Sequence, residues 1–544
     1  MISILPFILC SSMVGAEASL YDCSPQQSED LKPLTVGADT FQRRVLANGL
    51  HAVAIQQEAE TATLFLAVSA GTRNETAAIT GLAHLTEHAM FAGTSTTGTD
   101  VHEKTIVKWG GESNAYTRDD YTMYYDHEFP PAELATVLAM EADRLVNLSL
   151  ESAPVLHERH RLDLEEAHSY RTAEGRKEQL EAAVFQLHPY RFGLRSPEGH
   201  TRAPDLSVAT IESFYREHYR PNRVAIVVVS PLDANAALDA IEKAFADIPA
   251  GSVAPVISQE PIPNRARTVS LRSELPRDRN LRVWLTPAYG EKGRASLSIL
   301  AALLARAELP SGAQISIGMG DRTDRDLFQV GWTGDANVAI EVEALLNSYR
   351  DGSAFDEASA SDQLDEVKKL LIEGHKNQPL RARPYFAKAA TIARYQSLGL
   401  ADAYANWGKE IAKVSASDVA SAARKWLSKT SVVKVTFVGT GAAIEALPTD
   451  MEGLAEAASS AQETGDYPRA IEAYSRMLAL GPGRVNTVIY YAERGGLYME
   501  LNDFDSAIED FEAGLKVVNY PTVVDMLEEA YARKARAQRG DFSK

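Results

Sequence analysis

The sequence predicts an α+β protein built from two related domains, each a mixed sheet packed with helices, followed by an all-helical tail. Strand-like and helical segments alternate up to about residue 445. The apolar pattern around Ile211 and Val224 returns at Val419 and Val432, 208 residues later in both cases. From about residue 451 the periodicity is helical throughout. A pattern that repeats at a fixed offset favours two duplicated domains over one large fold.

The expected domain boundaries follow from these changes of pattern and from composition. A Pro-rich stretch, PVISQEPIP, separates the two repeated units and is typical of a linker. The expected segments are a signal peptide at 1–18, a polar lead-in at 19–42, a first domain at 43–252, a linker at 253–263, a second domain at 264–445 and a helical domain at 451–544.

The elements of the first domain are predicted from local periodicity. The segments HAVAIQ and ATLFLAVS are short apolar runs of the kind found in strands. Leu82, Leu85, Ala89 and Met90 have helical spacing and follow a loop at 71–80. The expected elements are strands at 51–56, 62–69 and 224–229 and helices at 81–93, 133–148, 152–170 and 232–247.

The chain begins with an apolar stretch at 2–16, followed by a small-residue sequence, A-E-A, at 16–18. We interpret it as a secretory signal, so that the mature protein starts near Ser19 and is periplasmic or secreted. No Lys or Arg precedes Lys32, which leaves a cytosolic protein with a slightly apolar start as the alternative. No other apolar run approaches the roughly 20 residues that cross a bilayer, so no membrane span is expected.

Charge and cysteine content exclude several classes of function. The 55 Lys and Arg residues against 74 Asp and Glu residues give a net charge of −19. Such a surface repels phosphate backbones, and no basic run offsets it, so nucleic-acid binding is not expected. Because Cys10 and Cys23 are the only cysteines, a disulfide framework and a Cys-rich zinc module are both excluded.

The tail carries a short internal repeat. The pattern from Tyr467 to Tyr474, Y-x-x-A-I-x-x-Y, returns from Phe504 to Phe511 as F-x-x-A-I-x-x-F, and a related start occurs at 540–542. This pattern resembles tetratricopeptide (TPR) repeats, whose period is about 34 residues. A generic helical hairpin is the alternative, and either structure is typical of a module that binds another protein.

The sequence HLTEH contains the residues with the clearest chemistry, His84, Glu87 and His88. Residues four apart on a helix share one face, so both imidazoles can bind one ion, and the Glu87 carboxylate leaves the helix from nearly the same face. A hydrolytic zinc site uses three protein ligands and a water, whose proton a nearby carboxylate can take. One helical turn therefore supplies two zinc ligands and a general base in the H-x-x-E-H order.

Over about residues 43–445 the chain resembles the pitrilysin/insulinase family of zinc peptidases. The resemblance rests on the sequence GLAHLTEHAMFAGT at 81–94, on GGESNAYTRDDYTMYY at 110–125 and on HYRPN at 218–222. It implies a fold in which two such domains form one half of a peptidase clamshell, with one Zn²⁺ per chain. It also implies that Asn114 and Ala115 meet an extended peptide substrate, which adds as a strand to a sheet edge.

The resemblance also implies the third zinc ligand. The family carries an E-R-x-x-x-x-x-E frame, which reads Glu158 to Glu165 here, and Glu165 falls 77 residues after His88. We expect Glu165 to be the ligand and Glu158 to orient a ligand imidazole. Adjacent Glu166 is the rival for the ligand position. Its direction on the same helix differs by about 100°, so Glu165 and Glu166 cannot both face the ion. His102, His127, His157, His160 and His168 are interpreted as ordinary surface or packing histidines.

The second domain departs from the family pattern. Residues 297–305, in the place comparable to the zinc helix, are apolar throughout. The stretch with an Arg and a Tyr that grips the substrate backbone in relatives is missing after Ala307, and we do not assign that role to nearby Arg322 or Arg325. The resemblance therefore implies the catalytic member of a pair, whose partner is a zinc-free family subunit in a heterodimer or a second copy in a homodimer.

Two functional hypotheses follow. The first is a zinc endopeptidase for peptides or unfolded polypeptide segments, with Glu87 as the general base. The second is a non-catalytic binding or assembly subunit of the same family, which uses its TPR-like tail to contact a protein partner. The retention of His84, Glu87, His88 and Glu165 favours the enzyme, because non-catalytic relatives typically lose zinc ligands.

Overall fold

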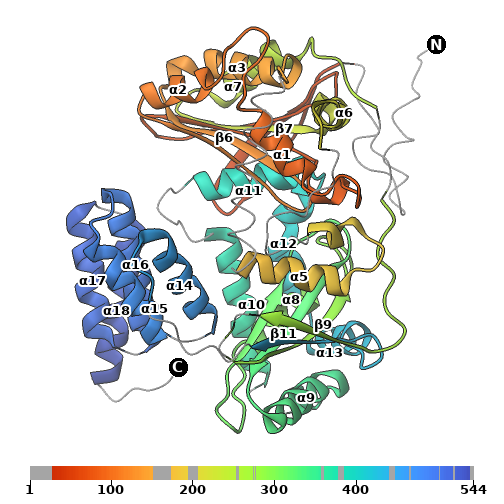
Figure 1. The fold of residues 1–544 in the computed structure, drawn as a ribbon, viewed down its shortest axis with the longest axis vertical. Helices are drawn as coiled ribbons and strands as arrows, with labels where there is room; N and C mark the ends of the chain where they lie inside the picture. Colours follow the sequence, from red (N-terminus) through yellow and green to blue (C-terminus); the bar gives the residue numbers. More distant parts are fainter. Residues whose placement is uncertain are drawn as a thin grey trace.

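The computed structural model describes residues 27–150, 173–193, 206–252, 257–273, 275, 277–356, 360–377, 385–439, 447–464, 467–501, 503–518 and 521–538. Figure 1 shows an upper and a lower α+β unit, with a group of C-terminal helices beside the lower one. Among the described residues, no helix is both long and apolar enough to cross a membrane.

The upper unit is built on a seven-stranded sheet in the order β1-β2-β3-β7-β4-β6-β5. Every residue of its central strands β4 and β7 is buried, as the continuous apolar sequences ATLFLAV and VAIVVVS require. β3 and β7 are parallel and the other neighbours are antiparallel. The strands are β1 (Glu29–Val36), β2 (Asp39–Val45), β3 (His51–Gln56), β4 (Ala62–Val68), β5 (Glu112–Thr117), β6 (Thr122–Phe129) and β7 (Val224–Ser230).

Helices pack on one face of this sheet, where α1, α3, α6 and α7 contribute apolar side chains to a common core. Each presents its apolar stripe to the sheet, as Leu82, Leu85 and Ala89 do from α1. The helices of this unit are α1 (Leu82–Ala89), α2 (Val101–Lys108), α3 (Leu134–Val146), α5 (Ala173–Val184), α6 (Val208–His218) and α7 (Ala234–Phe245), with short 3₁₀ turns η2 (Thr72–Asn74) and η4 (Pro189–Gly193).

The lower unit repeats the same plan, which confirms the predicted duplication. Its sheet has the order β8-β12-β9-β11-β10, equivalent to β3-β7-β4-β6-β5. Helices α6 and α13 have the same length and begin 208 residues apart. The lower unit contains β8 (Arg267–Ser273), β9 (Arg279–Thr286), β10 (Ile315–Met319), β11 (Asp326–Thr333), β12 (Val433–Gly439), α8 (Arg294–Leu304), α9 (Ala336–Asp351), α10 (Ala360–Asn377), α11 (Phe386–Ser397), α12 (Ala401–Lys413) and α13 (Ala416–Trp426).

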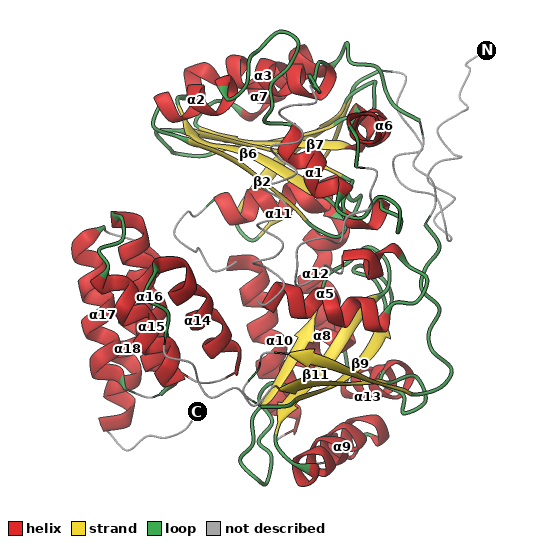
Figure 2. Cartoon of the chain, in the orientation of Figure 1, coloured by secondary structure: helices red, strands yellow, loops and turns green. Residues whose placement is uncertain are grey.

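Each unit covers the second face of the other unit's sheet. Helix α11 lies beneath the upper sheet and α5 lies on the lower one, as Figures 1 and 2 show. Ile392 and Ala393 of α11 are buried against Phe65 and Val227, and Leu180 and Val184 of α5 belong to one cluster with residues of the lower sheet. The two units therefore share their cores.

The C-terminal region is helical, as predicted, and consists of α14 (Met451–Thr464), α15 (Tyr467–Ala479), α16 (Arg484–Glu500), α17 (Phe504–Val517) and α18 (Pro521–Gln538). The repeated alanines, Ala470 of α15 and Ala507 of α17, are both fully buried. The third expected start, at 540–542, lies outside the described residues. The assignment to tetratricopeptide repeats therefore stays a prediction.

One difference from the sequence interpretation concerns the polar lead-in, where β1 and the start of β2 lie. β1 is the edge of the sheet, and only Leu34 and Val36 of its eight residues are buried. A strand with so little buried surface has no apolar run, so its composition resembles that of a loop.

Candidate active site

A buried carboxylate caps the helix that carries the HLTEH sequence. The glycine that precedes α1, Gly81, has φ +86° and no side chain that could cap the helix. Glu75 supplies the missing acceptors: its Oε2 accepts from the Gly81 amide and its Oε1 from the Ala83 amide, both at 2.8 Å. A negative charge beside free amides stabilises a helix N-terminus, so Glu75 fixes the start of α1.

The two histidines of α1 are placed as zinc ligands require. The Nε2 atoms of His84 and His88 lie 3.3 Å apart, and the two rings are 4.9 Å apart at 74°. Two imidazole nitrogens at about 2.0–2.1 Å from one tetrahedral ion would be separated by about 3.3–3.4 Å. Because both ligand atoms are Nε2 and both rings leave the same face of α1, this pair fits a zinc ion.

Glu87 comes from the same helical turn and is oriented by the neighbouring sheet. Its side chain is buried, and Oε2 accepts a hydrogen bond of 2.6 Å from the Thr117 hydroxyl at the end of β5. The Thr117 hydroxyl also lies 3.4 Å from that of Thr122, its partner on β6. The structure thus places Thr117, a residue not singled out from the sequence, in direct contact with the expected base.

β5 forms an edge of the seven-stranded sheet, beside α1. Asn114 is exposed and Ala115 is half-buried. The Ala115 amide donates to the Asn114 side chain at 2.8 Å, so it is directed away from β6 and toward the open edge. The alternation of the strand places Ala115 and Thr117 on one face and Asn114 on the other.

The predicted third zinc ligand cannot be placed in this site, because Glu158, Glu165 and Glu166 all lie outside the described residues.

The two arginines that lie near the missing substrate-gripping stretch are not part of this site either. Arg322 is buried among carboxylates from both units, with its Nε 2.8 Å from Asp119 Oδ2. Arg325 lies over the Trp426 ring. Neither arginine is among the side chains that contact His84, Glu87 or His88 in the described part of the chain.

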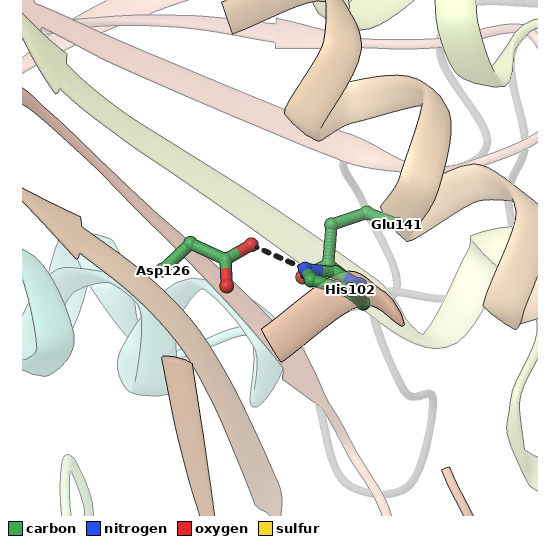
Figure 3. A group of neighbouring side chains, drawn as sticks. All are labelled: His102, Asp126 and Glu141. Carbon is green, nitrogen blue, oxygen red and sulfur yellow. Dashed lines mark hydrogen bonds and ion pairs between the residues drawn. The ribbon is translucent and has the colours of Figure 1, made fainter. Parts of the chain in front are cut away.

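A second group of possible ligands lies behind β6, where His102 of α2, Asp126 of β6 and Glu141 of α3 converge (Figure 3). His102 Nε2 is 2.9 Å from Asp126 Oδ2 and 3.9 Å from Glu141 Oε1. Arg144 donates to both oxygens of Glu141, at 2.6 and 2.7 Å. A divalent cation here would lie beside a guanidinium group, so this group fits a buried charge network better than a metal site. His102, interpreted from the sequence as a surface or packing histidine, is half-buried and takes part in this charge network.

The two carboxyl groups of this network, those of Asp126 and Glu141, have pKa values shifted in opposite directions. Burial raises the pKa of Glu141. Burial also acts against ionisation of Asp126, but His102 together with the other groups around it, Arg144 among them, outweighs burial and lowers the pKa of Asp126. The guanidinium of Arg144 lies 4.7 Å from the centre of the Tyr124 ring, whose hydroxyl is 2.9 Å from that of Tyr219. This network joins α2 and α3 to the strand that pairs with β5.

Family models match both units. The model described as insulinase (peptidase family M16) matches residues 52–198, which include HLTEH and the β5–β6 hairpin, and the model described as the peptidase M16 inactive domain matches residues 205–349. Together the matches span more than half of the chain. The chain belongs to the M16 peptidase family.

Relatives of this M16 protein include named peptidases. The probable mitochondrial-processing peptidase subunit beta of Schizosaccharomyces pombe is 31% identical over 203 residues, which are 37% of this chain and 44% of that protein. The zinc protease PqqE of Helicobacter pylori is 26% identical over 274 residues, 48% of this chain and 60% of that one. This M16 chain spans less than half the length of the first curated relatives that it matches.

A solved structure, that of a protease from Helicobacter pylori, has the same fold with a TM-score of 0.63 at 20% identity. The match covers 74% of this M16 chain and 99% of that chain. The resemblance stated from the sequence and the half-clamshell α+β fold are therefore confirmed.

Proposed function

We propose that this protein is a zinc-dependent endopeptidase that hydrolyses peptides or unfolded polypeptide segments. The observation that carries the proposal is the arrangement on α1 and β5: two Nε2 atoms 3.3 Å apart, and between His84 and His88 in the sequence a carboxylate that accepts from Thr117 at 2.6 Å. Membership of the M16 family and the named peptidases among the relatives support the same reaction class.

In this proposal His84, His88 and Glu165 bind the zinc ion, and Glu158 orients one of the imidazoles. Glu165 and Glu158 are assigned from the family pattern, with Glu166 as the rival of Glu165. A zinc ion in such a site supplies Lewis acidity and makes water nucleophilic at neutral pH.

Glu87 acts as the general base. Its carboxylate takes a proton from the attacking water and returns it to the amine that leaves. The hydrogen bond from Thr117 to Oε2 helps to orient the carboxylate. Because Thr117 ends the edge strand, the orientation of the base depends on the position of β5.

An extended substrate would bind along the open edge of β5. The Ala115 amide is directed toward that edge, and backbone pairing there would give affinity with little dependence on substrate side chains. Asn114, whose Oδ1 accepts from that amide, would have to release it when a substrate carbonyl arrives. We further propose a periplasmic or secreted location, a zinc-free family subunit or a second copy as partner in the active complex, and a protein partner for the tail.

The substitution Glu87→Gln tests the assignment of the base. We expect the variant to bind one zinc ion per chain and to cleave a quenched fluorogenic peptide about 10²–10⁴-fold more slowly than the wild type. Metal content by elemental analysis and cleavage with and without a chelator are the measurements. The control is Glu103→Gln, which changes an exposed carboxylate on α2 in the same domain.

Two outcomes would contradict the proposal. A zinc-loaded Glu87→Gln protein that still cleaves at the wild-type rate would remove Glu87 from the base role. A wild-type chain that binds no zinc and cleaves no peptide, alone or with a zinc-free partner subunit, would favour the non-catalytic alternative.

A further inference from the structure

A loop of the lower unit, the one without the histidine pair, contacts the turn that follows the edge strand β5 of the upper unit. The turn at 118–121 joins β5 to β6, and the loop at 320–325 joins β10 to β11. The two segments meet through buried polar side chains, and Arg73 from the segment before α1 joins them. We call this set the interdomain network; its members are Arg73, Asp119, Asp120, Glu181, His188, Tyr190, Arg322, Thr323, Asp324 and Asp326.

Asp120 is the centre of the network. Its side chain is 2% exposed and accepts from the Thr323 amide at 3.0 Å, the Thr323 hydroxyl at 2.9 Å and the Tyr190 hydroxyl at 2.5 Å. A buried carboxylate with this many donors is costly to remove, because each donor would lose its partner. The turn of the metal-bearing unit is thereby attached to a backbone amide of the other unit.

Asp119 contacts the same loop through Arg322. Its Oδ2 lies 2.8 Å from Arg322 Nε, and the other guanidinium nitrogens of Arg322 contact Asp326 and Glu181. On the opposite side, the backbone of the turn accepts from Thr72 and Arg73, at 3.2 Å and 2.9 Å. The turn is therefore enclosed between the segment that leads into α1 and the loop of the second unit.

Two carboxyl groups that contact Arg322, those of Glu181 and Asp119, have pKa values shifted in opposite directions. Burial raises the pKa of Glu181 to about 8, although Arg322 and Lys177 oppose the rise; Asp119 and Glu178 add to it. Burial opposes ionisation of Asp119 as well, but the nearby cations Arg322, Lys177 and Arg118 together outweigh it and lower the pKa of Asp119 to about 2. Asp119 therefore carries the charge that pairs with Arg322, and Glu181 holds the proton.

Arg73 extends the network to the metal helix. Its Nη2 lies 2.6 Å from Asp324 Oδ2 of the second unit, and His188 Nε2 lies 3.1 Å from the same oxygen. Only one residue separates Arg73 from Glu75, whose carboxylate caps α1. A displacement of Arg73 would thus reach the helix that carries His84.

We infer that the loop at 320–325 positions the catalytic half: through Asp120 it holds the β5–β6 turn, and through Arg73 it holds the segment that caps α1. The metal-free unit would then set the register of the substrate strand and the contact between Thr117 and Glu87. Asp120 and Thr323 are positioning residues in this scheme, because neither touches the reacting atoms. The consequence for catalysis rests on the proposed function; the positioning itself does not.

The test uses two variants of the full chain, Asp120→Asn and Thr323→Val, which preserve side-chain size and remove hydrogen bonds of the network. We expect hydrogen exchange of the amides at 112–117 to become about tenfold faster or more, with the zinc content unchanged. For the zinc-loaded enzyme, kcat/KM on a quenched fluorogenic peptide should fall by a similar factor. The control is Arg494→Gln, which breaks an ion pair of 2.6 Å with Asp510 in the C-terminal helices.

The exchange measurement does not depend on activity. If the wild type cleaves no peptide, the proposed function fails, and the exchange rates at 112–117 still decide the positioning. Unchanged rates at 112–117 in both variants would overturn the inference. So would an equal acceleration at 279–286 in β9, because the network would then support the fold in general and not the edge strand in particular.

Discussion

Replacement of Thr117 by valine isolates the hydrogen bond that orients the base. Valine has the shape of threonine and an equal preference for a strand, so β5 should keep its structure. The substitution removes the donor 2.6 Å from Glu87 Oε2 and leaves a buried carboxylate with one partner fewer. Hydrogen bonds to charged groups contribute about 1.5–3 kcal/mol, which corresponds to a loss in kcat of about 10–160-fold.

The assay is steady-state cleavage of a quenched peptide by the zinc-loaded Thr117→Val protein. We expect kcat to fall and KM to change little, because Thr117 contacts the base and no observation places it against the substrate backbone. The matched control is Thr436→Val, since the Thr436 hydroxyl donates at 3.0 Å to Asn280 in the second sheet. A Thr117→Val enzyme with wild-type kcat would show that the hydroxyl does not orient Glu87 during catalysis.

Two further predictions concern stability. The pKa of Glu181 is raised to about 8 from an ordinary value near 4.5, so the folded state holds a proton there that the unfolded state releases. This group should therefore make the free energy of unfolding fall as pH rises from about 5 to 8, by at most about 1.4 kcal/mol per pH unit. In urea unfolding across this pH range, the free energy of unfolding of Glu181→Gln should lack this pH dependence. A pH dependence equal to that of the wild type would refute the assignment of the proton to Glu181. Glu75→Gln should cost about 1–2 kcal/mol in the same measurement, because one capping acceptor and the charge are lost. A loss no larger than that of Glu60→Gln, which changes an exposed carboxylate, would contradict the capping role.

Local patterns of the sequence sufficed for the parts of the fold that are determined locally. β4 and β7 are continuous apolar runs, and such runs have few alternatives to a buried strand. The approach of the two imidazoles on α1 depends only on the geometry of one helical turn, so the closeness of His84 and His88 could be predicted without any tertiary structure. The duplication was visible because a helix and the strand that follows it recur at nearly the same offset, 208 residues for α6 and α13 and 209 residues for β7 and β12.

Contacts between distant segments were beyond that reasoning. The bond between Thr117 and Glu87 depends on where the edge strand lies beside α1, and no periodicity specifies that distance. A weak signal existed, since Thr117 lies two residues after Ala115 and therefore on the same face of β5. The pairing of Asp120 with Thr323 joins residues 203 apart, and buried polar groups of this kind resemble exposed loop residues in a sequence.

The duplication explains why the interdomain network joins these particular segments. In the equivalence of the two sheets, β5 and β6 correspond to β10 and β11, so the turn at 118–121 and the loop at 320–325 are the same position in the two units. A contact between equivalent surfaces is what a two-fold dimer forms, and the exchange of α5 and α11 has the same reciprocal character. Within that contact the charges have diverged: the upper unit supplies Asp119 and Asp120, and the lower unit supplies Arg322. The unit without the histidine pair has therefore kept the surface that reaches the site, which is the result expected if its remaining task is to position β5.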